Sequence, residues 1–292
     1  MKGMAEPVEH IDGLTSLEKR TFQFIFRTFG HSTFLLEEFL NKVPLEHIQA
    51  EWHFGLVLLC RRQIVSVKRK SWGERLFHVP VSLYFRIFNE LYAPLHSTAD
   101  DIDDEEATGE ASMSMAQTAL LLMLELEREP LFFTRRGQLQ KNSRDRMLRV
   151  FTQKEQEAGT NGRLPCFVEE SLDLMLRMGI VKIEDGMTAV QRSKYMSWLE
   201  MNGTEREEIM FMIWYRVHGP LDARLQWLTA ALWQAPAGKW VAMEHVLHRM
   251  REAGLSIAFE QVEKWLKRLQ IAGWIDMGID MLGRRIIRRT VR

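Results

Sequence analysis

The sequence predicts a mainly α protein of the α+β class, in which helices are combined with small β-hairpins. Apolar residues recur at helical spacing through most of the chain. Short runs rich in β-branched and aromatic residues occur in pairs around turn residues. Each such pair follows at least two predicted helices, which is the order of elements in a winged helix. We therefore predict tandem winged-helix domains with small β-hairpin wings.

The predicted organisation has three such units. Residues 1–13 form a flexible, polar N-terminus, and residues 14–95 form the first winged helix. Residues 96–112 form an acidic linker, residues 113–202 the second winged helix, and residues 203–292 the third, with a basic C-terminal wing. A chain of 292 residues is long enough for two or three small domains.

The first unit is predicted to contain three helices before its hairpin. Thr15 or Ser16 caps the first helix, because a side-chain hydroxyl can accept from a free N–H of the first turn. Thr33 is expected to cap the second helix. Pro44 is expected to be the first residue of the third, where its missing N–H costs nothing.

A basic segment surrounds the predicted hairpin of this unit, whose strands are residues 64–67 and 76–80. Between Gly55 and Val79, six bases and one acid, Glu74, give a net charge of +5. The bases are Arg61, Arg62, Lys68, Arg69, Lys70 and Arg75. Trp72 lies in the same turn, where it either stacks on a nucleic-acid base or packs back against the wing.

The linker is marked by its charge. Seven acidic residues and no base lie between Asp100 and Glu110. Such a run buries too little apolar surface to offset the entropy of ordering, so we expect it to be mobile. We expect a second, smaller flexible loop at residues 157–163.

The second unit is predicted from residues 130–199. Residues 131–134 form a short strand that ends in a turn, and Ser143 caps the helix that follows. A second helix covers residues 165–178 and ends at Gly179. The dipeptide Asp185-Gly186 lies between two short apolar runs and predicts a hairpin. A last helix then places Trp198 in the core.

This stretch carries a set of marked positions: Thr134, Gly137, Leu139, Gly179, Ile180, Val181, Thr188, Trp198 and Leu199. In this order, with a charged and then a Leu-rich helix between them, they resemble bacterial helicase-associated proteins related to the N-terminal region of XPB-type DNA helicases. Glu205, Arg206 and Trp214 continue the resemblance, which covers residues 14–274. The chain departs from the family at Ala189, where a Gly usually follows the Thr.

The third unit is predicted from Thr204, whose hydroxyl forms a capping box with the acid three residues later. Four helices follow, and residues 274–277 and 285–289 form the strands of a hairpin. From Arg284 to Arg292 there are five arginines and no acid, again a net charge of +5. The preceding helix ends in a further set of bases, Lys264, Lys267 and Arg268.

Composition limits the possible partners. The net charge is zero and the pI about 7.1, so attraction to nucleic acid must come from local patches. Cys60 and Cys166 are too few and too distant to indicate a disulfide framework, which favours a reducing, cytoplasmic location. The longest apolar run, residues 119–124, is too short for a membrane span.

The sequence gives no sign of catalysis. Residues 137–142 lack the second Gly and the Lys-Ser/Thr of a phosphate-binding loop. His245 and His248, beside Glu244, lack further ligands at metal-site spacing and are better read as a solvated face. We therefore expect no enzymatic activity, no metal or cofactor, and no small-molecule substrate.

The leading hypothesis is a non-enzymatic accessory protein that binds double-stranded DNA. The resemblance implies work beside a DNA helicase, in transcription or repair. The candidate DNA-binding residues are Arg61, Arg62, Lys68, Arg69, Lys70, Trp72, Arg75, Lys264, Lys267, Arg268, Arg284, Arg285, Arg288 and Arg289. Glu46 and Glu51 lie on the polar face of the third helix and would repel phosphate. The alternative is a scaffold whose winged helices bind a partner protein.

Overall fold

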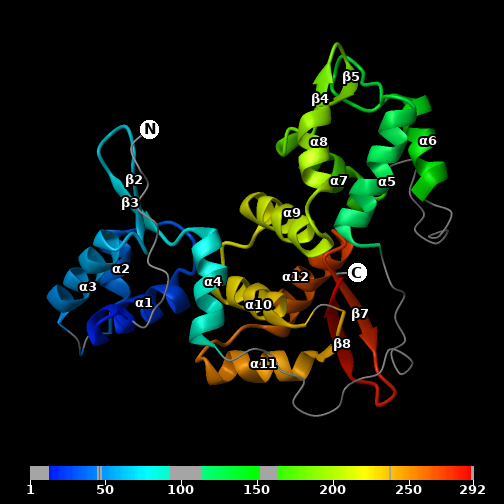
Figure 1. Ribbon diagram of the computed structural model, residues 1–292. Coiled ribbons are helices and arrows are strands. Elements are labelled where there is room, and N and C mark those ends of the chain that lie inside the picture. The colour runs from blue at the N-terminus through cyan, green and yellow to red at the C-terminus, as the bar shows by residue number, and fades with distance from the viewer. Residues whose placement is uncertain are drawn as a thin grey trace. The chain divides into compact units, whose positions relative to one another are not determined.

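The computed structural model describes residues 13–44, 46, 48–92, 113–151, 164–236 and 238–290. Within them the chain forms helices and small antiparallel sheets (Figure 1), which confirms the α+β class. The predicted linker at residues 96–112 and the loop at residues 157–163 lie outside the described residues, as do residues 1–12. None of the helices in the described ranges has the length and apolar content needed to cross a bilayer.

The chain is divided into two compact units, each built from segments that are far apart in the sequence. The first unit comprises Met1–Ile102, His218–Pro236 and Val241–Val262, and the second comprises Asp103–Val217, Ala237–Trp240 and Glu263–Arg292. Helices from the C-terminal third therefore complete the core of the N-terminal unit. The division into three consecutive winged helices stays a prediction.

The first helix of unit 1 starts where the sequence predicts. In α1 (Ser16–Thr28), the Thr15 hydroxyl accepts a hydrogen bond from the Glu18 N–H at 3.3 Å. The Glu18 carboxylate accepts in return from the Thr15 N–H at 2.8 Å. This reciprocal capping box satisfies two backbone donors with local contacts alone, which is why the sequence reveals it.

The next two helix starts differ from the prediction. Thr33 is not a cap: β1 (Phe34–Leu35) intervenes, and Leu35 is the N-cap of α2 (Leu36–Lys42). The reason is tertiary, because β1 pairs with β3 (Arg75–His78). Pro44 does not begin α3 (Gln49–Arg61). It follows the extended residue Val43, which ends α2, in keeping with the bias that Pro imposes on the preceding residue.

The predicted hairpin of unit 1 is present. Strand β2 (Ser66–Arg69) pairs with β3, and the sheet order is β1-β3-β2. Gly73 in its turn has a φ of 94°, a value that L side chains rarely adopt. The helix α4 (Val81–Leu91) follows directly.

The core of unit 1 is aromatic. Phe26 of α1 stacks on Tyr84 of α4, with ring centroids 4.1 Å apart. Trp227 of α10 (Ala223–Gln234) meets Phe88 of α4 edge-on at 5.2 Å. The remaining elements of this part of the chain are β6 (Val241–Ala242) and α11 (Met243–Glu252). Aromatic contacts of this kind stabilise the core beyond the contribution of the apolar surface area that they bury.

A buried amide ties the end of α1 to α10. The side chain of Gln226 is fully buried, and its carbonyl accepts from the His31 N–H at 2.8 Å. Its amide nitrogen donates to the Ser32 hydroxyl at 2.7 Å and to the Pro220 carbonyl at 2.8 Å. His31 is half-buried beside this clamp, and burial lowers its pKa to about 4.

His31 should therefore make unit 1 sensitive to acid. In the unfolded chain the His31 imidazole is protonated below about pH 6.5, but in the folded chain only below about pH 4. The contribution of neutral His31 to the free energy of unfolding is therefore complete above pH 6.5 and is lost as the pH falls toward 4. The lowered pKa corresponds to about 3 kcal/mol of unfolding free energy. Urea unfolding of the wild type and His31→Gln between pH 7 and pH 4 checks this. The stability difference between them should shrink by that amount, and a constant difference would contradict it.

Unit 2 follows the predicted order more closely. It contains α5 (Met115–Arg128), α6 (Lys141–Phe151), α7 (Cys166–Arg177), β4 (Val181–Glu184), β5 (Met187–Val190) and α8 (Arg192–Leu199). Asp185 and Gly186 have φ values of 51° and 75°, the two positive values that a primed hairpin turn requires. Gly179 ends α7 with a φ of 67°, as predicted.

Two local predictions in unit 2 are wrong. Ser143 does not cap α6, because it is the third residue of the helix and accepts from the Phe132 N–H at 3.0 Å. The capping box of α9 (Gly203–His218) is formed by Asn202 and Glu205, not by Thr204. Asn is among the best N-cap residues, so it outcompetes the neighbouring hydroxyl.

The predicted strand at residues 131–134 is only partly formed. Phe132 makes an isolated bridge to Met187 and Phe133 one to Leu139. Leu131 completes the contact with β5, since its carbonyl accepts from the Thr188 N–H at 2.9 Å. The segment is too short to continue the sheet.

The last elements of the chain are α12 (Phe259–Ile271), β7 (Ile275–Ile279) and β8 (Arg285–Arg289). β7 and β8 form the predicted C-terminal hairpin. Trp214 and Trp274 are buried beside each other with ring centroids 5.8 Å apart. Trp52, Trp227 and Trp265 are buried as well.

One order of elements occurs three times along the chain. A helix is followed by a short extended segment, two helices and a hairpin. The three series are α1-β1-α2-α3-β2-β3, then α5, residues 131–133, α6-α7-β4-β5, and finally α10-β6-α11-α12-β7-β8. The repetition lies in the order of the elements and not in the residues.

Candidate nucleic-acid interface

The hairpin β2–β3 carries most of the cations predicted for the first unit. Arg61, at the end of α3, is exposed, and so are Lys68, Arg69 and Arg75 on the strands. Within the described part of the chain, no carboxylate lies at ion-pair distance from these four side chains. Their charge is therefore available to a ligand.

Two of these cations lie directly opposite each other. Arg69 and Arg75 are cross-strand partners in the register of β2 and β3. Like charges at opposed positions destabilise an antiparallel pair. An anion bound between or beside them would relieve this repulsion, so the pair points to an acidic ligand.

The other predicted cations of this unit have structural partners. Arg62 donates to the buried carboxylate of Glu18 at 2.7 Å. Hydrogen bonds from Thr15 and Arg62 outweigh the effect of burial and lower the pKa of Glu18. Lys70 pairs with Glu74 across the turn at 2.5 Å. These two cations serve the fold and contribute less to the free positive charge.

Trp72 stands out from the turn with 73% of its surface exposed. The Lys70 ammonium lies 4.9 Å from the centre of its ring. The indole also hydrogen-bonds Glu74 of the same turn, so the ring keeps contacts within the wing. Stacking on a base stays a prediction.

The outer face of α3 is not a basic reading surface. Glu51 pairs with Arg20 at 3.1 Å in an exposed salt bridge, which offsets part of its repulsion of phosphate. Ile48 and Phe54 are 64% and 55% exposed beside it. An apolar, partly acidic face is poorly suited to the major groove.

Three of the C-terminal arginines, predicted as one cluster, form ion pairs within unit 2. Arg284 meets Asp280 at 2.6 Å, and Arg285 meets Glu263 at 2.9 Å. Arg289 is partly buried, and burial lowers its pKa from the usual value. Arg292 lies outside the described residues. The net charge counted along this stretch is thus balanced by acids from elsewhere in the sequence.

Arg288 is the clearest correction. It is 9% exposed and pairs with the buried Asp276 of β7 at 2.9 Å. Its guanidinium also lies 4.5 Å from the centre of the Trp240 ring. The expectation of an exposed arginine at this position is wrong, because a charge so enclosed is held by its partner and not by solvent.

The cations of α12 remain on the surface. Lys264, Lys267 and Arg268 are all exposed. The Arg268 guanidinium lies 6.0 Å from the centre of the Trp265 ring. They form a smaller basic surface on unit 2.

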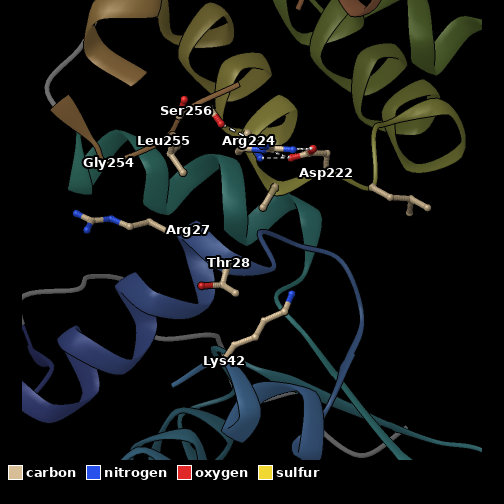
Figure 2. A pocket seen from close by; sticks show the side chains of 10 residues that line it. Arg27, Thr28, Lys42, Asp222, Arg224, Gly254, Leu255 and Ser256 are labelled. Carbon is tan, nitrogen blue, oxygen red and sulfur yellow. Dashed lines mark hydrogen bonds and ion pairs between the residues drawn. The ribbon is translucent and has the colours of Figure 1, made fainter. Parts of the chain in front are cut away.

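A polar cavity of about 480 Å³ lies in unit 1, beside the N-terminus of α10 (Figure 2). Arg224 neutralises Asp222 through paired hydrogen bonds, and this contact lowers the pKa of Asp222. Arg27 and Lys42 lie in the last turns of α1 and α2, where cations complement the helix dipole. Figure 2 shows the two side chains extending in different directions, so they do not converge on one ligand.

The described residues contain no group of three or more His, Cys, Asp or Glu side chains that could hold a metal ion. His248 is exposed and lies 3.7 Å from Glu252. Burial is the main cause that raises the pKa of Cys60 and of Cys166 to about 11, so neither thiol is activated as a nucleophile.

Sequence reasoning missed one feature of the hairpin. Val67 and Phe77 are register partners and line an apolar groove against α3. The alternation of side chains along each strand indicates this arrangement. Val67 is two positions from Arg69, and Phe77 is two positions from Arg75, so each apolar residue shares a face of its strand with an arginine.

No protein-family model matches the chain, and no curated protein does. The resemblance to helicase-associated proteins therefore stays a prediction.

Proposed function

We propose that this protein is a non-catalytic, winged-helix accessory protein that binds double-stranded DNA and works beside a DNA helicase. The threefold repetition of helix, short strand, two helices and hairpin supports the winged-helix assignment. The observation that carries DNA binding is the set of exposed cations on β2–β3, with Arg69 and Arg75 directly opposed.

Binding would be electrostatic and independent of sequence. Exposed lysine and arginine side chains on a hairpin can reach phosphates, and each neutralised phosphate releases counterions. The face of α3 offers little for base reading, since it carries Glu51 and Phe54. The hairpin therefore holds the backbone of the duplex, with Trp72 at its tip.

Replacing Lys68, Arg69 and Arg75 by glutamine should weaken binding to any duplex sequence by roughly tenfold or more. If all three side chains contact phosphate, the slope of log affinity against log salt should flatten by about 2.7. Fluorescence anisotropy with a labelled duplex at several salt concentrations measures both quantities.

The matched control removes three exposed cations outside the candidate set: Arg216, Arg251 and Lys182, each replaced by glutamine. It makes the same change in net charge, so its slope should stay close to that of the wild type. Equal slopes for the hairpin variant and the wild type would refute phosphate contact by the hairpin. The scaffold alternative would then be the better account of the protein.

A further inference from the structure

An apolar groove of about 700 Å³ lies in unit 1 between α3 and the β2–β3 hairpin. Val57 and Cys60 line it from α3, and Val67 and Phe77 line it from the hairpin. Leu35 and Leu36 line it as well. Its volume falls within the range of about 300–1,000 Å³ typical of ligand pockets.

The two faces of the hairpin differ in chemistry. Val67 pairs with Phe77, and Arg69 pairs with Arg75. Residues two apart on a strand share a face, so the opposed arginines lie on the face that lines the groove. Lys68 lies on the other face. The apolar groove thus continues outward into a pair of cations.

The charges around the groove are unequal. Arg61 and Arg75 line it and have no carboxylate partner among the described residues. Glu74 also lines it, but Lys70 neutralises this side chain. Glu37 also lines it, from the start of α2. The positive charge that lines the groove without a carboxylate partner thus comes from Arg75 on the hairpin and from Arg61 at the end of α3.

We infer that this groove binds a peptide segment of a partner protein in which apolar anchor residues are flanked by Asp or Glu. The anchors fill the space over Val57 and Val67, and the acidic flank meets Arg69 and Arg75. This occupant satisfies both the apolar surface and the opposed cations, whereas a nucleic acid would leave the apolar surface exposed. The inference does not depend on DNA binding by the hairpin.

The test is selection from a displayed library of random 16-residue peptides against the full-length protein. Selected peptides should combine apolar residues with an excess of Asp and Glu. The double variant Val57→Gln, Val67→Gln should weaken their binding by roughly tenfold or more, because it removes apolar contacts. The double variant Arg69→Gln, Arg75→Gln should weaken it as well and reduce its salt dependence.

The control changes two exposed apolar residues that lie outside the groove, Ile48→Gln and Phe54→Gln, and should leave peptide binding unchanged. Circular dichroism confirms that each variant is folded. Affinity for duplex DNA is measured in parallel, and the neutral groove variant should retain it. The proposal is overturned if no peptide is enriched, if enriched peptides lack acidic residues, or if they bind the groove variant as well as the wild type.

Discussion

Replacing Arg288 by alanine should lower the free energy of unfolding by about 3–5 kcal/mol, because the change strands a buried carboxylate. Asp276 is 4% exposed, and its partner Arg288 lies directly opposite on β8. The Nε atom of Arg288 donates to Asp276 at 2.9 Å. Chemical denaturation monitored by tryptophan fluorescence measures the loss.

Two further variants make this prediction specific. Arg285→Ala breaks the exposed pair with Glu263 and should cost no more than about 1 kcal/mol. The double variant Asp276→Leu, Arg288→Met removes both charges and should recover most of the loss, since an apolar pair often replaces a buried ion pair at little cost. A single Arg288→Ala variant as stable as Arg285→Ala would place Arg288 in solvent and contradict the buried pair.

Trp198→Ala should cost about 3–5 kcal/mol through the cavity that it leaves in unit 2. The ring is 2% exposed, which agrees with the inward position predicted for it on the last helix of the second unit. Tyr195 lies 6.4 Å away between ring centroids, and the Arg206 guanidinium lies 5.4 Å from the ring centre. Both contacts are lost with the indole.

Trp198→Phe is the matched control. It retains an aromatic ring and removes an indole N–H that is buried without a hydrogen-bond partner among the described residues. Its cost should therefore be clearly smaller than that of the alanine variant. Thermal unfolding ranks the stabilities of the wild type, Trp198→Phe and Trp198→Ala. An unchanged melting temperature for Trp198→Ala would contradict burial of the ring.

The parts of the fold that were predicted correctly depend on residues close together in the sequence. Thr15 and Glu18 cap α1 across three residues, and Asp185-Gly186 forms its turn within the hairpin itself. Helical spacing placed Trp198 in the core, because a residue's face follows from its position along the helix. The helix starts that were predicted at Thr33 and Pro44 are wrong, because strand pairing and packing outweigh a local cap.

The candidate site was predicted only in part, for a similar reason. The sequence located both basic stretches, since charge can be counted along the chain. It could not distinguish Arg69, which faces another arginine, from Arg288, which faces Asp276. That distinction depends on the register of two hairpins.

The sequence by itself determined the α+β fold class, the positions of most helices and turns, and the absence of a recognisable phosphate-binding motif. These follow from local hydrogen bonding, periodicity and motif. Only the tertiary structure decided which charged side chains are exposed without an ion-pair partner and which are held in ion pairs. Glu18 and Arg62 are 44 residues apart, yet they form one partly buried ion pair. Because the energy of a charge depends on its neighbours in space and on its burial, its role emerges only when distant segments pack together.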